Sequence, residues 1–136
     1  MRLHIPLKLR VLVTENAEHR CEYCCIHQSD LDFTFHVDHI ISLKHGGGDE
    51  FENLALSCSV CNQNKGTDLG TYLSGSDQLI RLFHPRRDKW DKHFKKDNGE
   101  IIPLTDIGAA TIKVLDLNNP DRIILRRLLV QAGRYL

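Results

Sequence analysis

The sequence predicts a small α+β domain that is held together by a metal site of four cysteines. The 136 residues, of which 41% are hydrophobic, suffice for one compact domain with its own core. Short segments rich in aromatic and β-branched residues are interspersed with segments of helical periodicity. Two Cys-x-x-Cys pairs, Cys21–Cys24 and Cys58–Cys61, have the spacing of the two turns that enclose one tetrahedral zinc.

The first element expected along the chain is a helix that begins at Pro6 and carries Leu9, Val13 and Ala17 on one face. Apolar residues also alternate with a period of two in this segment, so a strand is the competing interpretation, and we favour the helix. Four features should follow, in this order: a strand over 33–41, a break at Gly46–Asp49, a short extended segment over 53–56, and a helix from about Cys61 to Gly66 or Gly70.

The rest of the chain is predicted to contain a strand and two helices. A basic stretch with aromatic residues covers 81–97, and 100–104 resembles a strand. Thr105 can cap a helix that runs to about Leu117, and Pro120 can start a last, amphipathic helix. We expect residues 1–97 to form the main domain and residues 98–136 to form an extension that packs on it.

The overall charge balance argues against a generally basic, nucleic-acid-coating protein, because the formal net charge is zero. Residues 1–10 alternate charged and apolar residues and lack the apolar region of a signal peptide, and no stretch reaches the roughly 18 apolar residues of a membrane span. We therefore expect a reducing, cytoplasmic setting and no membrane partner. In such a setting Cys-x-x-Cys pairs favour metal binding over disulfides.

The four paired cysteines are predicted to bind a structural Zn²⁺, since a closed site of four thiolates leaves no open position for a reaction. The alternative is that they are small buried hydrophobic residues, and the paired spacing on both sides argues against this alternative. A fifth residue, Cys25, could replace Cys24 as a ligand or pack in the core. We favour the packing role because the x-x spacing of Cys24 makes the better turn.

Between the cysteine pairs, Asp38 and His39 place a carboxylate beside an imidazole near the end of a predicted strand. A lone histidine on a strand is more often a surface or core residue than a catalytic one. The residues that follow favour a catalytic role for His39. A Gly-rich loop leads to Asn53-Leu54 and then to Cys58-x-x-Cys61-Asn62-x-x-Lys65.

This ordered set of motifs resembles the zinc-containing branch of the HNH endonucleases, the ββα-metal or His-Me finger family. The resemblance covers residues 21–66, and the stretch Leu82-Phe83-His84-Pro85-Arg86 is also similar to a tail found with bacterial HNH proteins. The fold implied by the resemblance is a ββα-metal core, stapled by the zinc site of four cysteines and flanked by helices.

The resemblance also implies roles for individual residues. His39 would be the general base that activates water, Asp38 and Asn62 would bind a divalent cation, Asn53 would fix the loop and orient His39, and Lys65 would face phosphate. The third motif position is Asn62 rather than a histidine, and an amide oxygen suits Mg²⁺ or Mn²⁺. One cation and one imidazole suffice for phosphodiester hydrolysis. His36 is interpreted as a neighbour of this site rather than a ligand.

Outside the motif, the excess of positive charge over 81–97 suggests phosphate contacts, for which Arg86 and Arg87 are the candidates. Trp90 and Phe94 are expected to be core anchors rather than platforms for base stacking. The arginines of the last helix are expected on its solvent side.

The predicted function is metal-dependent endonucleolytic cleavage of DNA. Two alternatives stay open: a non-catalytic, zinc-bearing nucleic-acid-binding module, and a nuclease-fold component that is active only with a partner. The sequence leaves open whether the protein forms a homodimer, and it contains no recognisable module for reading a target sequence.

Overall fold

The computed structural model describes residues 5–31 and 34–136, and the elements in this part of the chain are small. The helix predicted from Pro6 is present as α1 (Leu7–Asn16), which packs against the first hairpin. The strand expected over 33–41 is shorter: β1 covers His36–His39, and Phe33 lies outside the described residues. A short 3₁₀ turn (Phe51–Asn53) leads into β2 (Leu54–Ser57).

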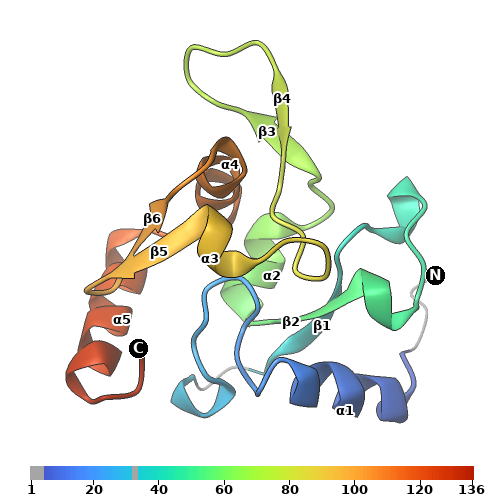
Figure 1. Ribbon diagram of the computed structural model, residues 1–136. Coiled ribbons are helices and arrows are strands. Elements are labelled where there is room, and N and C mark those ends of the chain that lie inside the picture. The colour runs from blue at the N-terminus through green and yellow to red at the C-terminus, as the bar shows by residue number, and fades with distance from the viewer. Residues whose placement is uncertain (1–4, 32–33) are drawn as a thin grey trace.

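The strands β1 and β2 form an antiparallel hairpin in which His39 faces Leu54 and Asp38 faces Ala55. The helix α2 (Ser59–Lys65) follows β2 directly, so β1, β2 and α2 make one ββα unit in the middle of Figure 1. Cys58 caps α2 by accepting a hydrogen bond from the Cys61 amide. The helix therefore begins at Ser59, two residues before the predicted start.

A second hairpin, β3 (Gly70–Tyr72) with β4 (Leu79–Arg81), projects away from the rest of the molecule (Figure 1). A third hairpin joins β5 (Phe94–Asp97) to β6 (Glu100–Pro103), and the single-turn helix α3 (Trp90–His93) precedes it. Of these strands only β6 was expected. The helices α4 (Asp106–Leu115) and α5 (Pro120–Gln131) follow, as predicted.

The core lies where the cysteine turns, the first hairpin and α4 meet. Val13, Tyr23, Leu54, Phe94 and Leu115 are all at most 1% exposed. Trp90 packs against this core and donates from its indole N–H to the Tyr23 carbonyl at 2.9 Å, which confirms its expected anchoring role with Phe94. The predicted α+β class is confirmed. No helix in the described ranges is long and apolar enough to cross a membrane.

The last helix does not present the face that its sequence pattern suggested. Arg126 is completely buried, whereas Ile124 and Leu128 are 55% and 58% exposed. The expectation that the arginines of α5 lie on its solvent side is therefore wrong for Arg126, and Arg122 is also partly buried. The inward face of α5 therefore combines apolar residues such as Leu125 and Leu129 with an arginine that donates to buried carbonyls.

Candidate metal centre and active site

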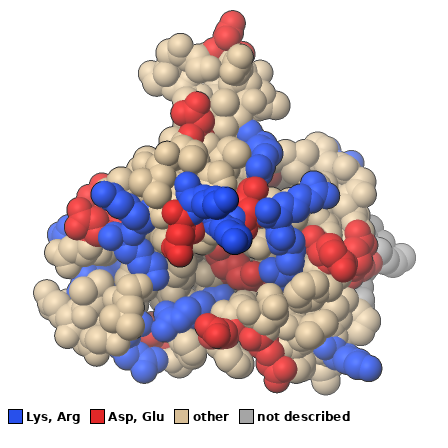
Figure 2. All heavy atoms as spheres, in the orientation of Figure 1, with Lys and Arg blue, Asp and Glu red and all other residues tan. Residues whose placement is uncertain are grey.

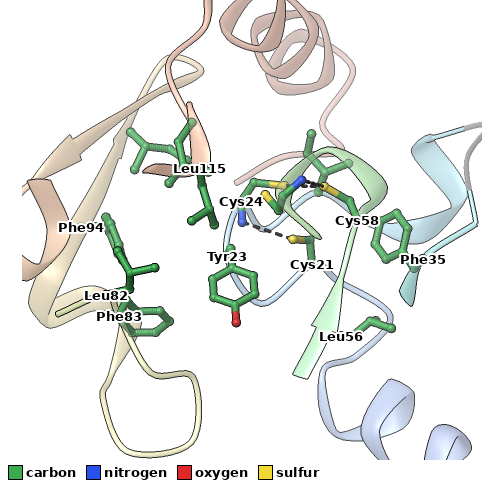
Figure 3. Close-up of a cluster of buried hydrophobic side chains, with 14 of the residues drawn as sticks. Cys21, Tyr23, Cys24, Phe35, Leu56, Cys58, Leu82, Phe83, Phe94 and Leu115 are labelled. Carbon is green, nitrogen blue, oxygen red and sulfur yellow. Dashed lines mark hydrogen bonds between the residues drawn. The ribbon is translucent and has the colours of Figure 1, made fainter. Parts of the chain in front are cut away.

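Four cysteine sulfurs converge at the N-terminus of α2, and all four residues are buried. The cluster comprises Cys21, Cys24, Cys58 and Cys61, whose Sγ atoms lie within 4.8 Å of one another. Figure 3 shows the labelled Cys21, Cys24 and Cys58 with their sulfurs turned toward a common point. Cys25 is not in the cluster, so Cys24 is the member of the first pair that the fold directs inward.

The geometry of the cluster fits a tetrahedral metal. The Sγ atoms of Cys24 and Cys58 are 3.8 Å apart, and ligands about 2.3 Å from a tetrahedral zinc would be separated by about 3.8 Å. In each pair the amide of the second cysteine donates to the first sulfur at 3.4 Å, so the two turns have matching geometry. Burial raises the pKa of Cys21 and Cys61 well above the ordinary value, whereas hydrogen bonds with the neighbouring Cys21 sulfur lower the pKa of Cys24 and Cys58.

The first cysteine turn is fastened to β2 through Glu22. Its amide donates to the Leu56 carbonyl at 2.8 Å, and its carboxylate accepts from the Leu56 amide at 2.7 Å. The same carboxylate accepts from both terminal nitrogens of Arg86 at 2.6 and 3.2 Å. The Arg86 guanidinium also lies 4.4 Å from the centre of the Phe51 ring. These contacts hold the cysteine turn in a fixed position relative to the first hairpin.

Asp38 lies in a buried polar cluster below the metal site. Its Oδ2 accepts from the Tyr23 hydroxyl at 3.0 Å and pairs with Lys65 Nζ at 3.1 Å. Burial raises the pKa of Asp38, while the Lys65 ammonium and the Tyr23 hydroxyl act in the opposite direction. The Tyr23 ring stands beside the cysteines with its hydroxyl directed away from the sulfurs (Figure 3).

Lys65 does not occupy the position expected for a phosphate contact. Only 2% of its side chain is exposed, and its ammonium donates to the His39 carbonyl at 3.1 Å as well as pairing with Asp38. A buried carboxylate needs a counter-charge, and the last turn of α2 supplies it at the end of β1. Lys65 therefore joins α2 to the strand that carries Asp38 and His39.

His39 is in contact with a residue that the sequence analysis did not single out. Its Nε2 lies 2.6 Å from Oδ1 of Asp49, and the two side chains are 19% and 35% exposed. An ionised carboxylate can only accept, so Nε2 donates in this contact, and no hydrogen bond of Nδ1 is found among the described residues. Nδ1 is therefore the ring nitrogen that can face a water or substrate. No local spacing in the sequence singles out Asp49, because its contact depends on how the loop after Gly46-Gly47-Gly48 returns toward β1.

Asn53 holds that loop in place. Its Oδ1 accepts from the Ile41 amide at 2.9 Å, and its Nδ2 donates to the carbonyls of Ile41 and Gly48, both at 2.8 Å. A side chain at Gly47 would meet the Ile41 carbonyl oxygen at 1.7 Å, so only glycine permits this close approach. Within the described residues Asn53 has no hydrogen bond to the His39 ring. It acts on His39 indirectly, by holding the loop that carries Asp49.

Asn62 lies one turn before Lys65 on α2 and is half-buried, and no hydrogen bond of its side chain is found among the described residues. The nearby His36 has its Nε2 3.3 Å from the Ser59 hydroxyl. Apart from the four cysteines, the described residues contain no group of three or more side chains of the types His, Cys, Asp and Glu that could hold a metal. No hydrogen bond joins Asp38 and Asn62 in the described part of the chain, and Asp38 Oδ2 is engaged by Tyr23 and Lys65.

The two arginines expected to contact nucleic acid have different surroundings. Arg86 is committed to Glu22, and only 10% of its side chain is exposed. Arg87 is exposed, has no ion pair in the part of the chain that is described, and lines two hollows together with His84 and Ile41. Figure 2 shows basic and acidic side chains interspersed over this side of the molecule rather than one basic face. Arg87 is thus the better placed of the two for an outside ligand.

Comparison with known proteins was made over the whole chain. Residues 21–68 match the family model of the HNH endonucleases. This HNH segment contains both cysteine pairs, Asp38, His39, Asn53 and Asn62, and it confirms the resemblance seen in the sequence motifs. No curated protein and no solved structure matched the chain.

The HNH match ends before the β3–β4 hairpin, so everything from β3 to α5 lies outside it. The matched family indicates nuclease-type chemistry for the ββα unit and a nucleic acid as its substrate class. The buried cysteine cluster is consistent with the zinc of the metal-stapled fold.

Proposed function

We propose that the protein is a metal-dependent HNH endonuclease that hydrolyses phosphodiester bonds in DNA, with His39 as the general base. The observation that carries this proposal is the contact of 2.6 Å between His39 Nε2 and Asp49, made at the end of the strand that also carries Asp38. A histidine oriented by a carboxylate, with the other ring nitrogen free, is the arrangement that a general base requires.

Five residues have separate roles in the proposed site. His39 Nδ1 accepts the proton of the attacking water, and Asp49 fixes the orientation of the ring. Asn53 holds the loop of Asp49, which supports the loop-fixing role inferred from the family resemblance. Asp38 and Asn62 would hold Mg²⁺ or Mn²⁺, whose oxygen preference matches their donors. When bound, this cation would supply Lewis-acid stabilisation of the phosphoryl oxygens.

The metal at the four cysteines is proposed to be Zn²⁺ with a structural role. Four thiolates complete a tetrahedral shell and leave no position for water or substrate. Zinc is then the scaffold on which β1, β2 and α2 are assembled, and the chemistry takes place about His39.

Cleavage of supercoiled plasmid with Mg²⁺, Mn²⁺ or EDTA tests the nuclease proposal. His39→Ala should lose about 10²–10⁴-fold in rate, the usual contribution of a general base, and should keep its fold and its DNA binding. His45→Ala is the matched control, because this histidine is exposed and lies in the same loop region. Asp49→Asn should lose part of the cleavage rate that His39→Ala loses. The cleavage rate of Asp38→Ala should be partly restored by excess Mn²⁺.

The alternatives predict different results in the same assay. A non-catalytic nucleic-acid-binding module would bind DNA without cutting it under any divalent cation, and His39→Ala would behave like wild type. A component that needs a partner would stay inactive until cell extract is added, and its regained activity would still require His39.

A further inference from the structure

The helix α5, outside the HNH match, carries two inward-turned arginines one turn apart, and one of them reaches the cysteine cluster. Arg122 Nη2 donates to the Sγ of Cys61 at 2.9 Å. Its Nη1 donates to the carbonyls of Leu115 and Asp116 at 2.7 and 3.1 Å. One guanidinium therefore connects the end of α4 to a sulfur of the cysteine cluster.

Arg126 is more deeply placed, with none of its surface exposed. Its Nε donates to the Gly99 carbonyl at 2.6 Å, and its Nη2 donates to the Leu117 carbonyl at 2.6 Å. Its Nη2 also donates to Asn118 Oδ1 at 3.2 Å, while within the described residues Nη1 has no partner and no carboxylate pairs with this arginine. Arg126 therefore holds α5 against the turns at Gly99 and Leu117.

The cysteine cluster provides negative charge beside Arg122. Four thiolates around one Zn²⁺ carry two net negative charges, and the Arg122 guanidinium that contacts Cys61 carries one positive charge. Burial acts to lower the pKa of Arg122, and the charges of Cys61 and Cys24 act to raise it. Just beyond α5, the buried Tyr135 hydroxyl donates to the Cys24 carbonyl at 2.7 Å, so this end of the chain contacts both cysteine turns.

We propose that Arg122 balances part of the charge of the zinc tetrathiolate, so that α5 contributes to the metal centre. Arg122 acts as a positioning residue through its hydrogen bond to Cys61, whereas Arg126 anchors α5 through the carbonyls of Gly99 and Leu117. This inference rests on the proposed structural zinc and is independent of the proposed nuclease activity.

Zinc retention in the full chain tests the inference. The zinc-loaded protein is mixed with excess EDTA, and protein-bound zinc is followed by elemental analysis of desalted samples. Arg122→Met should release zinc about 10–100-fold faster than wild type, the usual effect of removing a partner of a metal ligand. Arg122→Lys keeps the positive charge and loses the planar guanidinium, so its rate of zinc release should lie between those of wild type and Arg122→Met. Arg127→Met is the matched control, because Arg127 is exposed and bonds only the Asn98 carbonyl among the described residues.

Two further measurements separate an electrostatic role from a merely structural one. In the Co²⁺-substituted protein, loss of the N–H···S bond in Arg122→Met should move the sulfur-to-cobalt absorption to lower energy, and Arg127→Met should not move it. Arg126→Met loses the donors to the carbonyls of Gly99 and Leu117, and Arg126 contacts no cysteine among the described residues, so this variant should lower stability and leave the cobalt absorption unchanged.

The outcomes distinguish the two proposals. One zinc per chain in wild type, combined with unchanged release and an unchanged cobalt spectrum in folded Arg122→Met, would overturn the role of α5 alone. Absence of zinc from folded wild type would overturn both the zinc site and the arginine role. Faster release and a shifted cobalt absorption in Arg122→Met, with wild-type behaviour in Arg127→Met, would establish the charge balance.

Discussion

Lys65 shows how one residue can lie where the motif places it in the chain and still act differently from its expected role. Its spacing from Asn62 puts both residues on one side of α2, which the sequence alone indicates. Which of them reaches solvent depends on how α2 packs on β1, and the structure places the Lys65 ammonium against Asp38. Lys65, which the family resemblance assigns to phosphate binding, thus forms an internal ion pair with Asp38.

The Asp38–Lys65 pair is expected to be essential for stability. Lys65→Met should lower the free energy of unfolding by about 3–5 kcal/mol, because it leaves a buried carboxylate without its counter-charge. Urea unfolding of the zinc-loaded protein measures this. Adding Asp38→Asn to Lys65→Met should recover much of the loss, since no uncompensated charge then remains. A loss below about 0.5 kcal/mol, as for a surface lysine, would contradict the buried pair.

Arg86 and Arg87 are adjacent in sequence and should respond oppositely to the same substitution. Arg87→Met should reduce the slope of log K against log salt for DNA binding by about 0.9, the value for one phosphate contact, at unchanged stability. Arg86→Met should lower stability by about 1.5–3 kcal/mol, because Glu22 loses charged hydrogen bonds, and should keep the wild-type slope. Fluorescence anisotropy titrations and urea unfolding of both variants test this. The opposite assignment of the two effects would refute it.

At the scale of elements, the sequence predicts most helices and fewer strands. α1, α4 and α5 each have a start signal, a proline or a capping threonine, that depends only on neighbouring residues. The β3–β4 hairpin and β5 have no such local signal. β3 and β4 have three residues each, and β5 reads Phe-Lys-Lys-Asp, so its pairing with β6 rather than its composition makes it a strand.

The inward face of α5 shows why a hydrophobic pattern alone was insufficient. Arg126 turns inward because unpaired carbonyls at Gly99 and Leu117 need donors, and those carbonyls belong to turns that the sequence does not place. The four cysteines, Asp38, His39 and Asn53 could be located because their spacing is local. Asp49 and Arg122 could not, because their partners are set by loop return and helix docking.

The cap of α4 offers a prediction for an element whose start was predicted correctly. Thr105 Oγ1 accepts from the Gly108 amide at 3.1 Å and contacts His93 Nδ1 at 2.6 Å. Thr105→Ala should cost about 0.5–2 kcal/mol of stability, because a helix N–H loses its acceptor. Thr105→Ser retains the hydroxyl and should stay near wild type in thermal unfolding. Equal losses for both variants would show that the methyl group, and not the cap, matters.

At the scale of the whole molecule, the metal centre compensates for short secondary structure. No strand in the described ranges exceeds four residues, and the separate two-stranded hairpins cannot share one sheet core. The cysteines join the turn after α1 to the start of α2, and the contacts of α5 and Tyr135 bring the last third of the chain to the same point. The fold is therefore organised around the cysteine cluster.

Removal of zinc should consequently unfold the molecule as one unit. Protein washed with a strong chelator should lose its near-ultraviolet circular dichroism and its cooperative thermal transition, and both should return with one equivalent of Zn²⁺. Elemental analysis before and after washing gives the stoichiometry. Metal-free protein that retains a cooperative transition would show that the hairpins and helices suffice without the centre.

The contact between Arg122 and Cys61 has a consequence for the order in which the chain assembles. A guanidinium loses less free energy on leaving water when it meets a negatively charged partner, so α5 should dock after the cysteines have taken up their ion as thiolates. During synthesis all four cysteines emerge before α5 does, which gives the ion time to bind. Docking of α5 then becomes the last step of folding, and it completes only around a loaded centre.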